Sequence, residues 1–292
     1  MARDIQWVAA DGTAIRLTDR AAGWRVLDRT TGLSSPPYEV PEDQYAGEDG
    51  AEEGPVRAQP RDVNLAVQLE VPSGSGDLAL RRKVAALTRA MRPKLGAGRL
   101  VVTDEEGGVR TLTCRYRSGL DGDEARTSTI PGRWWRAIVK LRAADPWWYG
   151  PEVPVDFGLA APTPFFPILP VRLSSSSVQG EFEVDLTGAD AESYPLWTIT
   201  GPGSSLTLAN RTTGQQIQVN AELGDGQKMI IDTRRGRQSV MREDGVNLMG
   251  ALATDPAMWS LAERLNKVSA QLNSAGANSR IHGVYAPRYA GA

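Results

Sequence analysis

The stretch "RWWRAIVKLRAADPWWYG", residues 133–150, places four of the chain's eight tryptophans within fifteen positions. Successive side chains of an extended strand point to opposite faces. One face of this strand would carry Trp135, Ala137, Val139 and Leu141, and the other would carry Trp134, Arg136, Ile138, Lys140 and Arg142. The first set is apolar and predicts a core-facing side. The second set mixes a ring and an aliphatic side chain with three cations, as on a surface that something else half covers.

Further strands are predicted before this stretch. "IQWVAADGTAIRLT" (residues 5–18) consists of two apolar runs around Asp11-Gly12, which is a hairpin signal. "RDVNLAVQLEVP" (residues 61–72) alternates in the manner of a strand with one buried face. These patterns indicate a mainly β chain whose first half is an antiparallel β domain.

One clear helix is predicted in this half, over residues 77–92. Its apolar residues recur at spacings of four, three and four, which places them on one face of a helix: Leu80, Val84, Leu87 and Met91. Pro93 ends the pattern, and Asp77 is a candidate cap. We therefore expect residues 1–150 to form a β domain with one helix packed on it.

An acidic segment, residues 34–60, separates two of the predicted strands. It is rich in proline, glycine and carboxylates and poor in aliphatic side chains, so it is predicted to be a long exposed loop. Its acids lack the alternating spacing of a calcium-binding loop. They are interpreted as a solvated charge run.

The second half begins after a proline-rich segment, residues 151–170, which is expected to be a stiff connector that does not enter a sheet. Short strands with Gly-rich turns follow, and they predict a β-sandwich over residues 171–292. In "EFEVDLT" (residues 181–187) the inward side chains would be Phe182, Val184 and Leu186. The late segment "DPAMWSLAERLNKVSAQLNS" (residues 255–274) is either a short helix or a strand with a loop.

Composition excludes several classes of function. The formal net charge of -2 gives no electrostatic footprint for wrapping nucleic acid. No apolar run reaches the roughly 18 residues that a membrane-spanning helix needs, and the N-terminus lacks the apolar region of a secretory signal, so synthesis in a cytoplasm is expected.

The chemistry-bearing residues are sparse. One cysteine, Cys114, allows no internal disulfide, and one histidine, His282, argues against a histidine zinc site. Cys114 alternates with apolar neighbours and is expected to be a core thiol. The chain has no phosphate-binding loop and no metal-ligand spacing. We predict no catalytic residue, no cofactor and no metal.

The order of these signals resembles the distal tail proteins of bacteriophages with long, non-contractile tails. Three stretches carry the resemblance: "RDVNLAVQLEVPSGSGDLALRRKVAALTRAMRP", the run "GRLVVTDEEGGVRTLTCRYRSGL" leading into "WWRAIVKLRAADPWWYG", and "YPLWTITGPGSSLTLANRTTGQQIQV" followed by "IDTRRGRQSV". Together they cover most of residues 60–250. The acidic segment at 34–60 has no counterpart in the resemblance.

The resemblance implies an N-terminal ring-forming β domain with a helix and a C-terminal galectin-like sandwich. It implies a hexameric ring at the tail tip of the virion, which joins the tail-tube protein to the tail hub and to receptor-binding fibres. It implies no catalytic residue.

A ring of identical subunits needs two different contact patches per subunit, and the cores of interfaces are rich in tryptophan, tyrosine and arginine. The candidate interface residues are Trp134, Arg136, Trp148 and Tyr149. The alternative is that the tryptophans, with Trp147, fill a core within the domain.

Two other functions remain open at this stage. The sandwich is alternatively a carbohydrate-binding module for attachment to the host cell wall, with Trp197 and Trp259 stacking on a sugar ring, although the alternation of Trp197 with Ile199 favours burial. A cell-wall hydrolase is the weaker reading, because no pair of carboxylates is placed opposite one another by any sequence pattern.

Overall fold

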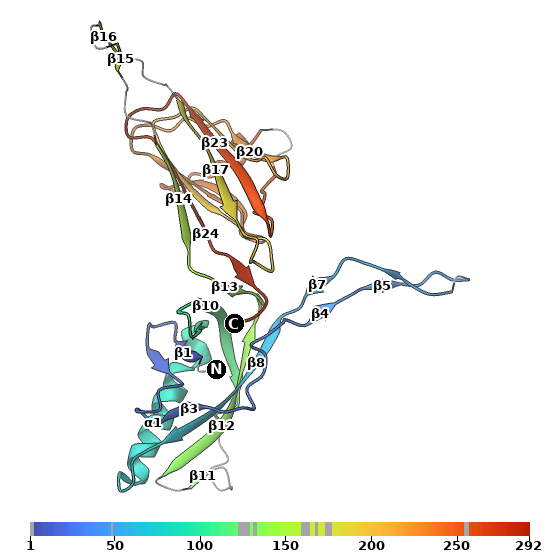
Figure 1. The fold of residues 1–292 in the computed structure, drawn as a ribbon, viewed down its shortest axis with the longest axis vertical. Helices are drawn as coiled ribbons and strands as arrows, with labels where there is room; N and C mark the ends of the chain where they lie inside the picture. The colour runs from blue at the N-terminus through green and yellow to red at the C-terminus, as the bar shows by residue number, and fades with distance from the viewer. Residues whose placement is uncertain are drawn as a thin grey trace. The chain divides into compact units, whose positions relative to one another are not determined.

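A computed structural model describes residues 3–47, 49–121, 129–130, 133–158, 164–166, 169–172, 177–253 and 257–292 (Figure 1). The chain divides into two compact units. Unit 1 comprises Met1–Gly150 and Tyr289–Ala292, and unit 2 comprises Pro151–Arg288. Unit 2 is therefore inserted between two segments of unit 1. The fold is mainly β, as predicted, with one α-helix among the described residues.

Unit 1 is built on one large antiparallel sheet with the strand order β2-β1-β9-β10-β12-β8-β3. Three short strands, β11, β13 and β25, pair beside this path. The strands are β1 (Asp4–Val8), β2 (Ala14–Arg16), β3 (Trp24–Val26), β8 (Arg61–Glu70), β9 (Gly98–Thr103), β10 (Val109–Ser118), β11 (Thr129–Ile130), β12 (Trp134–Ala143), β13 (Trp148–Tyr149) and β25 (Arg288–Tyr289).

Strand β12 confirms the alternation predicted for its sequence. Trp135, Val139 and Leu141 are buried in the core of unit 1. The intervening side chains, from Trp134 to Arg142, are half-buried or exposed. All ten residues of β12 pair with β8, from Trp134 opposite Glu70 to Ala143 opposite Arg61. β12 lies between β10 and β8, and β8 is next to the edge strand β3.

Helix α1 (Gly76–Ala90) packs on this sheet with the predicted apolar stripe. Leu80, Leu87 and Met91 are buried, and the indole Nε1 of Trp7 on β1 donates a hydrogen bond of 3.0 Å to the carbonyl of Ala90. That bond satisfies one of the carbonyl groups that the last turn of a helix leaves without a partner. Ser75, not Asp77, occupies the N-cap position.

The acidic segment is a two-stranded ribbon and not the loop that was expected. Strand β4 (Tyr38–Glu39) pairs with β7 (Arg57–Ala58), and β5 (Glu42–Asp43) pairs with β6 (Glu52–Glu53). Neither pair joins the large sheet of unit 1 (Figure 1). We call residues 37–59 the arm. The loop was predicted from the low aliphatic content of the segment. A hairpin, however, pairs its backbone N–H and C=O groups across the two strands whatever its side chains are.

Unit 2 is a sandwich of two antiparallel sheets, with the orders β14-β24-β18-β21-β22 and β17-β23-β19-β20. The strands are β14 (Val153–Gly158), β17 (Ser177–Asp185), β18 (Leu196–Thr200), β19 (Ser205–Asn210), β20 (Gln215–Val219), β21 (Lys228–Asp232), β22 (Ser239–Arg242), β23 (Leu265–Asn273) and β24 (Arg280–Tyr285). A further hairpin consists of β15 (Pro164–Phe166) and β16 (Leu169–Arg172).

The core of unit 2 is centred on Trp197, whose ring lies 5.9 Å from that of Trp259 between centroids. Trp197 is opposite Gly283 on β24, and a Cβ atom there would lie 2.5 Å from the indole ring. Glycine is therefore required at this position. In β17 the inward residues Val184 and Phe182 are buried and half-buried, as predicted.

The segment predicted as a connector enters a sheet. Strand β14 pairs along its whole length with β24, and Pro154 lies opposite Val284. β14 is an edge strand, and an edge strand tolerates a proline because one side of its backbone needs no donor. Residues 159–163 and 167–168 of that prediction lie outside the described residues. Of the two readings of residues 255–274, the strand is right, since β23 occupies Leu265–Asn273.

Within the described ranges, no helix is both long and apolar enough to span a membrane. The same residues contain no cluster of three or more His, Cys, Asp or Glu side chains that is placed to hold a metal ion.

Candidate functional site

The first candidate surface is the side of the unit 1 sheet that points away from its core, which we call the outer face. Strand register places its members side by side on β3, β8, β10 and β12. They are Arg25, Asp62, Asn64, Gln68, Glu70, Arg115, Trp134, Arg136, Ile138, Lys140 and Arg142. Ile138 is 43% exposed, so an apolar side chain lies open at the middle of the face.

Trp134 and Arg136 form a cation–π pair on the outer face. The Arg136 Cζ atom lies 4.5 Å from the centroid of the Trp134 ring. The Arg136 Nε donates to the Gln68 Oε1, and the Gln68 Nε2 donates to the Glu70 Oε1. Glu70 also pairs with Arg25 at 3.3 Å. This chain of contacts holds the aromatic and cationic side chains in place without a partner.

The outer face is predominantly cationic. Five of its side chains are basic, and two are acidic. Asp62 accepts from Arg142 at 2.7 Å, and Glu70 pairs with Arg25, so both carboxylates are engaged. The net charge of the outer face is therefore positive. A partner that carries acidic side chains would complement this face.

Trp148 does not belong to a subunit interface. Its side chain has no exposed surface and lies in the core of unit 1, so the prediction for this residue is wrong. A two-residue strand is too short for alternation to show which side chain faces the core. In the structure the Trp148 ring faces the core. Its neighbour Tyr149 is half-buried and donates from its hydroxyl to the Asp145 Oδ2 at 2.5 Å.

The structure does not bring the four candidate interface residues together. Trp134 and Arg136 lie at the first end of β12, opposite Glu70 and Gln68. Trp148 lies at the other end, because the guanidinium of Arg61, which pairs with Ala143, is 6.0 Å from its ring centroid. Nine strand steps separate these ends, which is roughly 30 Å. Of the four candidate interface residues, Trp134 and Arg136 therefore lie together on one surface. Tyr149 lies away from them.

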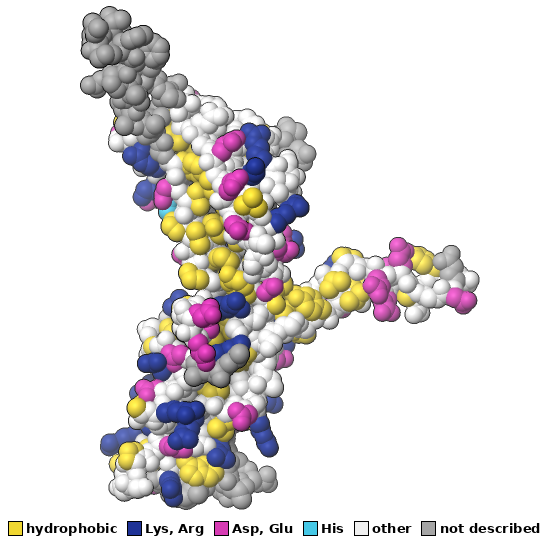
Figure 2. Space-filling view, viewed as in Figure 1, with side chains coloured by type: hydrophobic (Ala, Val, Ile, Leu, Met, Phe, Trp, Pro, Cys, Tyr) yellow, Lys and Arg dark blue, Asp and Glu magenta, His cyan; other side chains and the backbone are white. Residues whose placement is uncertain are grey.

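The arm is the second candidate surface, and it was not predicted from the sequence. Tyr38, Val40, Tyr45 and Val56 are between 40% and 61% exposed. Figure 2 shows hydrophobic and acidic side chains together along the arm. Its described acids are Glu39, Glu42, Asp43, Asp49, Glu52 and Glu53. The signal that could have revealed it is the presence of tyrosine and valine in an otherwise acidic segment.

The other singled-out residues belong to the cores. Trp197 and Trp259 are each 1% exposed, so neither can stack on a sugar ring. Cys114 is also buried, and burial raises the pKa of its thiol to about 12. A thiol with that pKa stays protonated at neutral pH and is a poor nucleophile.

Comparison with known proteins gives the fold a precedent. No family model and no curated protein matches the sequence. The crystal structure of SPP1 Dit (gp 19.1), described as a paradigm of the hub adsorption apparatus in phages that infect Gram-positive bacteria, matches with a TM-score of 0.64 at 16% identity. That match covers 99% of this chain and 100% of the other.

Two structures of the phage P2 baseplate in its activated conformation, with Ca and with Sr, also match. Each has a TM-score of 0.54 at 9% identity, and each covers at least 98% of both chains. These likenesses show that the chain has the fold of these phage proteins from end to end.

Proposed function

We propose that this chain is a structural protein of a bacteriophage tail, without catalytic activity, that assembles with copies of itself into a ring. The ring, hexameric by resemblance, lies at the distal end of a long, non-contractile tail and joins the tail-tube protein to the tail hub and its receptor-binding fibres. The observation that carries this proposal is the fold match to SPP1 Dit, which spans both units and the whole of both chains.

A fold does not establish a function, so the surfaces of the chain have to support the proposal independently. The arm does so. A two-stranded hairpin is marginally stable in water by itself. This hairpin holds four exposed tyrosines and valines and joins no other sheet of its own unit. A partner that covers those side chains would stabilise it.

Charge favours a second copy of this chain as that partner. The arm presents six described carboxylates and one arginine, Arg57. The outer face of another copy presents an excess of cations around Trp134 and Ile138. In the proposed ring, the arm of one copy lies on the outer face of the next. Two different patches in contact make a heterologous interface, and such interfaces generate rings when the rotation closes.

Mass photometry tests the proposal under three conditions: the purified chain alone, the chain with the tail-tube protein, and the chain with the hub protein. A discrete ring, of six copies in the proposed form, is expected. Antibody labelling of intact particles in electron micrographs should mark the tail tip. Monomers under all three conditions, or particles that lack the chain, would refute the proposal. Loss of turbidity of host cell walls on adding the pure protein would instead indicate a hydrolase.

A further inference from the structure

Unit 2 contains a pocket that lies outside the arm and the outer face. Its volume is about 390 Å³, which falls in the range of roughly 300–1,000 Å³ typical of small-molecule sites. Among the lining residues, Glu192, Tyr194 and Ser260 are half-buried, and we call them the floor; Trp259 is buried behind them. All of these residues belong to unit 2, so the pocket is complete in a single copy.

The floor is held rigidly by hydrogen bonds. The Glu192 carboxylate accepts from the Tyr194 hydroxyl, from the Ser260 Oγ at 2.6 Å and from the Arg235 Nη2 at 2.7 Å. The Arg288 Nη1 donates to the backbone carbonyl of Glu192 at 2.9 Å. Polar groups that are fixed in this way before a ligand arrives lose little entropy when it binds.

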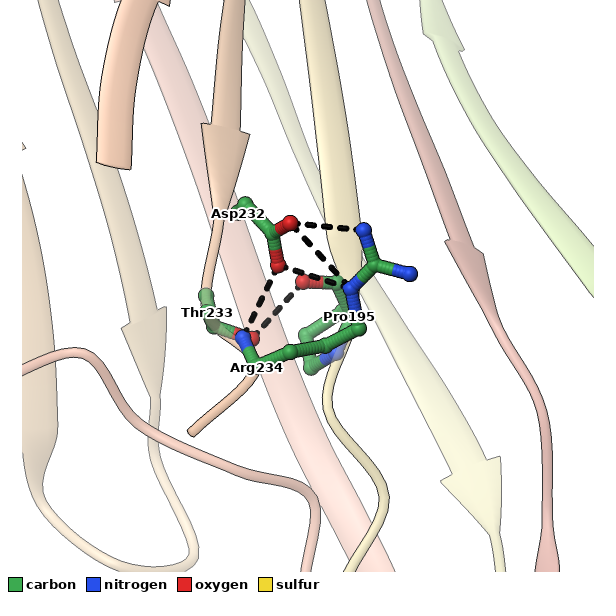
Figure 3. Close-up of polar contacts among 4 residues, drawn as sticks. All are labelled: Pro195, Asp232, Thr233 and Arg234. Carbon is green, nitrogen blue, oxygen red and sulfur yellow. Dashed lines mark hydrogen bonds and ion pairs between the residues drawn. The ribbon is translucent and has the colours of Figure 1, made fainter. Parts of the chain in front are cut away.

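The loop that carries Arg235 is also fixed, as Figure 3 shows. The Asp232 carboxylate accepts from the backbone N–H of Arg234 at 3.0 Å and from its guanidinium. The Thr233 hydroxyl donates to the carbonyl of Pro195 at 2.7 Å. Since Pro195 follows Tyr194 directly, this bond ties the loop to the segment that forms the pocket floor.

The rim offers polar groups with spare bonding capacity. Gln215, Gln238 and Glu263 line the pocket and are exposed. Nothing in the described part of the chain hydrogen-bonds to their side chains. An amide supplies donors and acceptors together, and a carboxylate supplies acceptors. Met258, which is half-buried, adds an apolar surface beside them.

We propose that this pocket binds a neutral saccharide of the hexose class. Such a ligand has hydroxyl groups around its edge, which suit Gln215, Gln238 and Glu263, and C–H groups on its faces, which suit Met258. Charge argues against an anionic ligand, because Arg235 is paired with Glu192 and Glu263 adds a further carboxylate to the lining. Trp197 and Trp259 are buried, so neither stacks on the sugar in this proposal. It goes beyond the proposed function, since assembly requires no ligand.

Saturation-transfer difference NMR on the full chain tests the inference, with glucose, galactose and N-acetylglucosamine as separate probes at millimolar concentration. At least one probe should receive saturation. The double variant Gln238→Ala/Glu263→Ala should weaken its affinity about tenfold, as expected for the loss of one or two hydrogen bonds. Gln216→Ala is the matched control: it lies exposed on the same strand as Gln215 and outside the pocket.

Absence of saturation transfer from all three probes would overturn the inference. So would equal affinity of the double variant, or binding of inorganic phosphate in place of the sugars. Mass photometry of the same variants separates this inference from the proposed function, because loss of sugar binding with an intact ring affects only the pocket. Both substitutions are at exposed positions, and unchanged thermal unfolding would confirm that the fold is intact.

Discussion

The guanidinium of Arg61 lies 6.0 Å from the ring centroid of Trp148, and both side chains are almost completely buried. Arg61 has no carboxylate partner in the described structure and instead donates to three backbone carbonyls, those of Gly32, Ser34 and Ala290. Burial lowers the pKa of Arg61. A buried cation that binds only carbonyls joins the loop between β3 and β4 to the second segment of unit 1, residues 289–292.

Replacing this cation should destabilise unit 1. Arg61→Met removes the donors for three carbonyls and is expected to lower the free energy of unfolding by about 3 kcal/mol. Chemical denaturation followed by tryptophan fluorescence measures the change. Arg99→Ala, at an exposed position on β9, is the control and should have little effect. Equal stability of the two variants would show that the carbonyls find other partners.

Reversing the charge of the arm should impair assembly. Glu52→Lys with Glu53→Lys replaces attraction to the outer face by repulsion, so mass photometry should record monomers, with an unchanged midpoint of thermal unfolding. The same reversal at Glu105 and Glu106, in an exposed turn of unit 1, is the matched control and should leave the ring intact.

A charge swap sharpens this test. Adding Arg136→Glu and Lys140→Glu to the arm variant restores the opposition of charges and should recover at least part of the assembly. If the ring forms equally well in the wild type and in both reversed forms, the arm and the outer face do not meet.

Variants of the two neighbouring tryptophans of β12 should differ in their effects on ring assembly and on stability. Trp134→Ala is expected to weaken ring formation and to lower stability by only about 1 kcal/mol, because its ring is half-buried and stacked on Arg136. Trp135→Ala creates a cavity in the core and should lower stability by about 3–5 kcal/mol. Thermal unfolding and mass photometry of both variants give the comparison. A larger stability loss for Trp134→Ala would assign that residue to the core.

Unit 2 should lose stability in acid through Glu192. Burial by itself would raise the pKa of this carboxyl, but hydrogen bonds from Ser260 and Tyr194 outweigh it and hold the pKa below the ordinary value of 4.5. The stabilisation is therefore complete above about pH 4.5 and is lost as the pH falls through the lowered folded-state pKa. In the variant Glu192→Gln, the midpoint of thermal unfolding should depend less on pH between pH 3 and 7. An unchanged slope would assign the acid sensitivity to other carboxylates.

Local patterns in the sequence predicted the regular elements well. The two faces of β12 and the stripe of α1 follow from side-chain periodicity, which is a property of a few consecutive residues. Trp148 could not be assigned in this way, because a two-residue strand has too few positions to show a period. Pro154 argued against a sheet, although the edge position of β14 accommodates it.

Contacts between distant residues were beyond prediction. Arg61 and Ala290 are separated by 229 positions, and no motif links them. The pocket combines residues from four separate segments of unit 2, including Glu192, Gln215, Gln238 and Glu263. The cationic outer face needs the register of β8 against β12, which one sequence does not supply.

A ribosome begins unit 1 before unit 2 and adds the second segment of unit 1 only after unit 2. Arg61 is translated early, yet one of its three carbonyl partners does not exist until Ala290 has been added. Ala292 similarly supplies a backbone N–H to Leu33 at 2.9 Å. Polypeptides usually fold domain by domain while they are being made. Here unit 1 gains its second segment only after unit 2 has been translated, so a fragment that stops before Tyr289 lacks part of the unit 1 fold.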